Sequence, residues 1–155
     1  MLAHVQAAHV LAPILLTLSG KESPGFVYAF QKSNEPQLML SFGDNQGEKY
    51  WKRHCILNDK LMRTRQEPTH FCYDSRDPKK PAHGQPMEVP PLGNWGGAVS
   101  MGDDVFAGIS GFSEEQDEAG ALAITAYARG NWDFPHLKLR EPVQEILKRI
   151  QALVP

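Results

Sequence analysis

The chain has 155 residues, of which 41% are hydrophobic and 22% charged, values typical of a globular domain with a core of its own. Its formal net charge of −2 excludes the strong positive field with which basic proteins attract nucleic acid or anionic lipid. The two cysteines, Cys55 and Cys72, are too few for a disulfide scaffold and form no CxxC pair. This usage favours reduced thiols in a cytoplasmic protein.

The first segment, residues 2–18, is apolar enough to be considered as a signal peptide. No basic residue precedes Lys21, however, and His4, Gln6 and His9 interrupt the apolar run. The segment is also too short and too polar to span a bilayer. We therefore expect a core helix and no membrane partner.

The expected first helix has an apolar side, with Pro13 inside it and Ser19-Gly20 at its end. Pro13 should kink this helix or end its first part, because proline lacks the amide hydrogen that the helix needs. The side expected to face the core consists of Leu2, Val5, His9, Ala12 and Leu16, with Ala8, Leu11 and Leu15 beside it.

Two strand-like runs, residues 26–31 and 37–42, follow and flank a plausible hairpin loop. Residues 48–66 then show helical periodicity, with Tyr50, His54, Leu57 and Leu61 in one stripe. Six basic residues lie mostly off the stripe and are interpreted as a solvated face, with a phosphate-binding face as the alternative: Lys49, Lys52, Arg53, Lys60, Arg63 and Arg65.

The middle of the chain is rich in proline and polar residues. Residues 69–73 are consistent with a short strand, and residues 74–91 with an irregular loop. A loop of this length in a compact domain is usually functional, so it would serve as a lid or as an oligomer contact.

A second hairpin is expected from residues 96–101 and 105–112, which flank a Gly-Asp-Asp turn. Ser113 begins a capping box in which its hydroxyl accepts from the Gln116 amide and the Gln116 side chain reaches back. The helix that follows should run to about Arg129, bury Ala119, Leu122, Ala123, Ala126 and Tyr127, and end at Gly130. A final helix is expected over residues 141–153.

The resulting order is α-β-β-α, then β-β-α-α, in one domain that covers residues 1–155. Two hairpins with segregated helices predict an α+β fold in which an antiparallel sheet is packed by helices. We expect the glycines at 96, 97, 108 and 111 to keep the sheet surface thin, so that the capped helix lies flush on a sheet shared by both hairpins.

The second hairpin resembles that of the haem-binding GlcG/HbpS-like domain family. The matching residues are Gly96-Gly97-Ala98-Val99, the strand from Val105 to Gly111, and Glu115-Gln116-Asp117-Glu118, and the resemblance covers roughly residues 93–128. It implies a profilin-like fold and assembly into homo-oligomers. Some members are reported to bind or degrade haem, and others have no defined activity.

The candidate ligand-binding residues are His54, Trp51, Trp95, the pair Gly96-Gly97, and Asp117. His54 is interpreted as a core histidine bonded to a carbonyl, with an axial ligand of haem iron as the alternative. Trp95 could stack on a flat ligand or pack at a rim. The six histidines show no zinc-site spacing, so no metal site is expected.

The acidic run Glu114, Glu115, Asp117 and Glu118 is explained by the positive end of a helix, where carboxylates are favourable. The family-like motif suggests that Asp117 makes a further structural or ligand contact. No nucleophile with a base and an orienting group is apparent, and no P-loop or serine-hydrolase elbow is present.

Three hypotheses remain open at this point. The favoured one is a homo-oligomeric domain that binds a small ligand, with haem as a candidate, and catalyses nothing. The alternatives are a structural or interaction module, and an enzyme that acts on a small metabolite or degrades haem.

Overall fold

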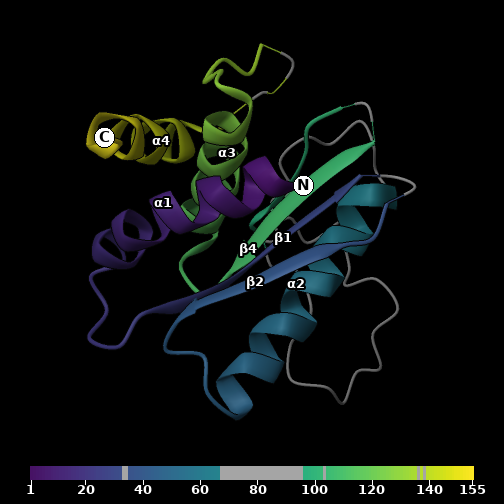
Figure 1. The fold of residues 1–155 in the computed structure, drawn as a ribbon, viewed down its shortest axis with the longest axis vertical. Coiled ribbons are helices and arrows are strands. Elements are labelled where there is room, and N and C mark those ends of the chain that lie inside the picture. The colour runs from purple at the N-terminus through teal and green to yellow at the C-terminus, as the bar shows by residue number, and fades with distance from the viewer. Residues whose placement is uncertain (33–34, 67–95, 103, 136, 138) are drawn as a thin grey trace.

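The computed structural model describes residues 1–32, 35–66, 96–102, 104–135, 137 and 139–155 (Figure 1). The predictions for residues 69–73, for the loop 74–91 and for Trp95 lie outside this part of the chain. The described elements are, in order, α1 (Leu2–Leu18), β1 (Gly25–Lys32), β2 (Leu38–Gly43), α2 (Glu48–Gln66), β3 (Ala98–Ser100), β4 (Val105–Ser110), α3 (Glu114–Arg129) and α4 (Glu141–Leu153).

The four strands form one antiparallel sheet in the order β2-β1-β4-β3. The two hairpins join through β1 and β4, which pair from Val27 opposite Ser110 to Lys32 opposite Val105. This arrangement confirms the predicted α+β class and the shared sheet, and its strand order is compatible with a profilin-like fold.

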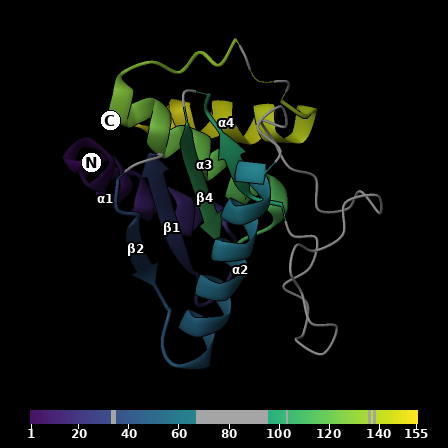
Figure 2. The ribbon, with the colours of Figure 1, turned by 90° about the vertical axis from the view of Figure 1, so that its right-hand side faces the viewer.

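The helices cover both faces of the sheet. Of the described helices, α2 covers one face, and α1 and α3 cover the other, with α4 packed against α3 (Figures 1 and 2). Side chains alternate along β1, so Phe26 and Tyr28 enter one layer while Val27 and Ala29 enter the other. The layer under α2 is small and also contains Leu57, Leu61, Ala98 and Phe106.

Helix α1 continues through Pro13, so the predicted break at this residue is wrong. Pro13 and His9, whose carbonyl would accept the missing hydrogen bond, are both exposed, so water can solvate that carbonyl. The core-facing side is also displaced from the predicted one, because Leu2 is 70% exposed and His9 is exposed. The buried residues are Ala7, Ala8, Leu11, Ala12 and Leu15.

The glycines follow the prediction only in part, because a Cβ on Gly97 would meet the capped helix and one on Gly108 would not. A Cβ on Gly108 would lie 2.8 Å from Leu57 Cδ1 of α2, so this glycine admits α2 rather than the capped helix. The capped helix α3 approaches the sheet through a glycine of its own. A Cβ on Gly120 would lie 2.8 Å from Ile109 Cδ1. Both faces of the sheet thus depend on a missing side chain.

The capping box is confirmed in one half only. Ser113 Oγ accepts from the Gln116 amide at 3.3 Å, as predicted. The Gln116 side chain does not reach back, since its amide group donates to the Leu15 carbonyl at 3.2 Å and so links α3 to α1. Helix α3 ends at Gly130 in the left-handed region, as predicted. Tyr127, expected in the core, is only half-buried.

Candidate functional site

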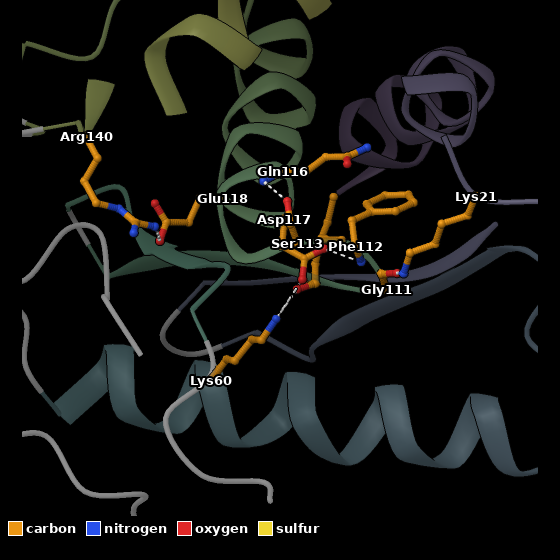
Figure 3. Close-up of polar contacts among 10 residues, drawn as sticks. Lys21, Lys60, Gly111, Phe112, Ser113, Gln116, Asp117, Glu118 and Arg140 are labelled. Atoms are coloured by element: carbon orange, nitrogen blue, oxygen red, sulfur yellow. Dashed lines mark hydrogen bonds and ion pairs between the residues drawn. The ribbon is translucent and has the colours of Figure 1, made fainter. Parts of the chain in front are cut away.

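A buried ion pair joins α2 to the start of α3 (Figure 3). Lys60 Nζ donates to Asp117 Oδ2 at 2.9 Å and to the Ile109 carbonyl at 2.9 Å. Asp117 Oδ1 accepts from the Phe112 amide at 3.0 Å. The Lys60 side chain is 2% exposed and that of Asp117 is 3% exposed, so two opposite charges are buried together and hydrogen-bonded at this position.

Burial raises the pKa of the Asp117 carboxyl above its usual value, because the charged form loses its hydration. The Lys60 ammonium and the Phe112 amide oppose this rise. The pair therefore compensates the cost of burying a carboxylate at this position.

The prediction for Lys60 was wrong, because it placed this residue on a solvated face. The residues three and four positions before it, Leu57 and Ile56, are both buried, so Lys60 shares their side of α2. The spacing can be seen in the sequence, but it does not by itself predict a buried Lys60, because fully buried lysines are rare. The further contact expected of Asp117 is found in this pair.

Gly97 leaves the space that the pair occupies. A Cβ at this position would lie 2.5 Å from Asp117 Cβ and 2.7 Å from Lys60 Nζ. Its φ of +114° also disfavours any L side chain. Gly97 and Asp117, two of the predicted site residues, are thus brought together, and Gly96 lies buried beside them.

A cavity of about 340 Å³ opens next to the pair, between the first half of α2 and the segment that leads into α3. The described residues of its lining contribute five cationic side chains and one carboxylate, which gives these residues a formal charge of +4. The lining residues are Lys21, Lys49, Lys52, Arg53, Ile56, Lys60, Ser110, Gly111, Phe112 and Asp117. The volume lies near the lower end of small-molecule sites.

Several of these cations are held in place by short contacts. Lys21 Nζ donates to the Gly111 carbonyl at 2.8 Å (Figure 3), and Lys49 Nζ pairs with Asp44 at 2.8 Å. Arg53 Nη1 donates to the Asp44 carbonyl at 2.6 Å and also to Asn45 Oδ1. Burial lowers the pKa of Arg53, but an arginine remains charged at neutral pH.

Lys52 differs from these residues. It is exposed at the cavity, and in the part of the chain that the structure describes no hydrogen bond or ion pair holds it. A lysine ammonium offers three donors, so Lys52 is available to a ligand.

The predicted aromatic residues lie elsewhere. The His54 ring is 5.7 Å from the Tyr50 ring and 6.1 Å from the Trp51 ring, and Trp51 is 63% exposed. His54 is half-buried, and its Nδ1 has no hydrogen-bond partner among the described residues. This differs from the predicted core histidine bonded through a carbonyl. None of these residues lines the cavity, so the predicted site residues divide into two groups.

Haem iron requires an axial side chain such as histidine. None of the described histidines lines the cavity, and the described residues contain no group of histidine, cysteine or carboxylate side chains arranged to hold a metal. The cations would suit the carboxylates of a porphyrin. The described residues alone do not complete an iron-ligating haem site, so we derive no chemistry through haem.

A second cavity, of about 430 Å³, lies beside the start of α1 and includes His4 and Thr125 in its lining. His4 stacks on Phe30 with ring centroids 3.6 Å apart, and its Nδ1 is 3.0 Å from the Tyr28 hydroxyl. Burial, together with the charged N-terminus, lowers the pKa of His4 to about 4. Burial also raises the pKa of Tyr28, so both rings are uncharged at neutral pH.

No family model matches the chain, and neither the curated proteins nor the solved structures contain a significant match. Among the described residues, no helix combines the length and apolar character needed to cross a bilayer. The structure thus defines an α+β domain with a positively charged cavity between its two helical layers.

Proposed function

We propose that this chain is a small-ligand-binding domain whose ligand is an anion held in the cavity beside Lys60 and Asp117. The observation that carries the proposal is the formal charge of +4 on the lining of a cavity in a chain whose net charge is −2. The cations are therefore concentrated at one place. A cleft lined by one sign of charge attracts ligands of the opposite sign and raises their local concentration.

The lining favours binding over catalysis. Among the described lining residues the one carboxylate is Asp117, which uses both oxygens, one on Lys60 and the other on the Phe112 amide. Action as a general base would require it to break a buried ion pair. Positive charge next to the apolar side chain of Ile56 suits a ligand with an anionic head and an apolar body.

The test is calorimetric titration at low salt with a panel of small phosphates and carboxylates, together with thermal unfolding in their presence. We expect at least one anion to bind with a Kd that weakens as NaCl is raised from 50 to 300 mM, because salt screens exposed charges. Lys52→Gln should weaken binding about tenfold, since a hydrogen bond to a charged group contributes about 1.5 to 3 kcal/mol.

The matched control is Lys148→Gln, which removes one positive charge from an exposed position on α4. It should leave the Kd unchanged. If no anion binds, or if both variants weaken binding equally, the cavity is not the binding site.

Haem is a second candidate, which the family resemblance suggests. One observation favours it: His54 carries a buried nitrogen without a described partner, beside the rings of Tyr50 and Trp51. Hemin titration should then give a shifted Soret band with one equivalent per subunit, and His54→Ala should abolish it. An unshifted band would exclude this candidate.

The resemblance also suggests that the domain assembles into homo-oligomers. Light scattering on the purified protein tests this, and a monomer at micromolar concentration would rule it out.

A further inference from the structure

Building on the proposed anion site, we infer that the ligand is a phosphomonoester with a small apolar body. Its phosphoryl group would lie between Lys52, Arg53 and Lys21, and its apolar body would lie against Ile56. The inference deepens the proposed function by naming the ligand class, and it rests on four features of the cavity.

The first feature is the direction from which the cations come. Lys21 follows α1, Lys52 and Arg53 lie in the first half of α2, and Lys60 lies further along the same helix. Lys21 and Lys60 approach the segment at Gly111 from different sides (Figure 3). Donors that surround a site suit a phosphoryl group, whose three terminal oxygens point in three directions. A carboxylate offers two oxygens in one plane.

The second feature is the amount of charge. Asp44 lies outside the lining and pairs with Lys49, and Lys60 is neutralised by Asp117. Lys21, Lys52 and Arg53 form no ion pair among the described residues, so they supply the excess positive charge. The carboxylates of Asp44 and Asp117 act on Arg53 through space and offset part of this excess. A phosphomonoester carries a charge of about −1.5 to −2 at neutral pH, which matches this excess better than a single carboxylate does.

The third feature is the end of a helix. Gly111 and Phe112, which line the cavity, directly precede Ser113, the N-cap of the 16-residue helix α3. The amide groups at a helix N-terminus carry a partial positive charge that favours phosphate. This field adds to that of the side chains, while the Phe112 amide itself donates to Asp117.

The fourth feature is the apolar wall. It is formed by Ile56, which lines the cavity from α2. The Phe112 ring does not belong to this wall, because it packs against Phe26 in the layer of α1 and α3, with ring centroids 5.2 Å apart (Figure 3). An apolar ligand body gains free energy when it leaves water for contact with Ile56. A volume of about 340 Å³ holds a phosphoryl group and a small ring system but not a larger cofactor.

The experiment compares four probes by calorimetry: phenyl phosphate, inorganic phosphate, benzoate, and vesicles that contain phosphatidic acid. Phenyl phosphate should bind at least about tenfold more tightly than inorganic phosphate, which lacks the ring, and than benzoate, which lacks the phosphoryl group. Its affinity should rise as pH increases through about 6, where the second phosphate proton leaves.

Two variants locate the site. Arg53→Lys keeps the charge but loses the planar fork, and should weaken phenyl phosphate about tenfold. Lys148→Gln should change nothing. Thermal unfolding of Arg53→Lys is measured in parallel, because Arg53 also bonds Asp44 and Asn45. A folded variant with unchanged affinity would refute the assignment of Arg53.

The remaining outcomes separate the two proposals. If benzoate binds as tightly as phenyl phosphate, the anion site stands and the phosphoryl inference fails. If phosphatidic acid vesicles bind and phenyl phosphate does not, the phosphate belongs to a lipid headgroup and the small apolar body is refuted. If none of the four probes binds, both this inference and the proposed function are wrong.

Discussion

Replacing Lys60 with methionine gives the most direct test of the buried pair. Methionine has a similar length and keeps the apolar stem of the lysine in contact with the core, so little packing is lost. The change leaves Asp117 buried at 3% exposure with the Phe112 amide as its remaining partner in the described structure. The Ile109 carbonyl also loses the bond from Lys60.

The expected cost is large compared with the stability of a domain of this size. Removing one partner of a buried pair destabilises a protein by about 3 to 5 kcal/mol, because a charge remains buried without compensation. The total stability of such a domain is about 5 to 15 kcal/mol. Lys60→Met should therefore unfold at a much lower urea concentration, with an unchanged slope of free energy against urea.

The double variant Lys60→Met/Asp117→Asn isolates the charge effect. It removes both charges, and the asparagine oxygen can still accept from the Phe112 amide. We expect the double variant to recover about 2 kcal/mol or more relative to the sum of the single changes. If the stability loss of the double variant equals the sum of the two single losses within about 0.5 kcal/mol, the two residues are not coupled.

The pH dependence gives an independent check. Without the ammonium, burial should raise the Asp117 pKa further, so the folded state holds a proton that the unfolded chain has released. Protonation then favours folding. The loss of unfolding free energy in Lys60→Met should be largest at neutral pH and should shrink as pH falls toward the ordinary aspartate range. A loss that does not change with pH would contradict the idea that the variant buries an uncompensated carboxylate.

Three further predictions concern stability and are checked by urea unfolding. Gly97→Ala should lower the free energy of unfolding by about 3 kcal/mol, because its Cβ would overlap the ion pair. The control Gly130→Ala, with a positive φ but open space around it, should cost about 1 kcal/mol. Equal losses in the two variants would refute the steric argument. Because the fold lowers the pKa of His4 from 6.5 to about 4, stability should fall as pH drops from 6.5 to 4, by up to about 3 kcal/mol, and His4→Gln should remove this slope. Ser113→Ala should cost about 1 kcal/mol through loss of the helix cap, and an unchanged midpoint would exclude that role.

The sequence predicted the elements well wherever a local signal marked their ends. The helices at residues 48–66 and 141–153 have the predicted bounds, and the helix between Ser113 and Gly130 begins and ends at its caps. The predicted break at Pro13 was wrong because the effect of a proline depends on whether the carbonyl it leaves unbonded can reach water. That property belongs to the folded surface and cannot be obtained from spacing alone.

The site was harder to predict, because it is formed by residues that are distant in sequence. Lys60 and Asp117 are 57 positions apart. Local sequence explains Lys60 as part of a solvated helix face and Asp117 as an acid at a helix N-terminus. The two side chains meet only because of the way α2 packs against β4 in the folded chain. Gly97 was singled out for a thin surface, and the structure supplies the reason, which is the ion pair beside it.

Asp117→Asn separates the structural role of this residue from its effect on the ligand. The carboxylate lies in the wall of a cavity that we propose for anions, where it would repel them if Lys60 did not neutralise it. Asparagine keeps the shape and the bond from the Phe112 amide, and it leaves Lys60 with a positive charge at the cavity. The variant should therefore be less stable than the parent in urea and yet bind phenyl phosphate more tightly.

A catalytic base or a metal ligand at this position would give the opposite result, since its loss would reduce activity or metal binding without strengthening the binding of an anion. Weaker phenyl phosphate binding by a folded Asp117→Asn protein would show that the carboxylate contacts the ligand directly, and the electrostatic reasoning for this cavity would then be wrong.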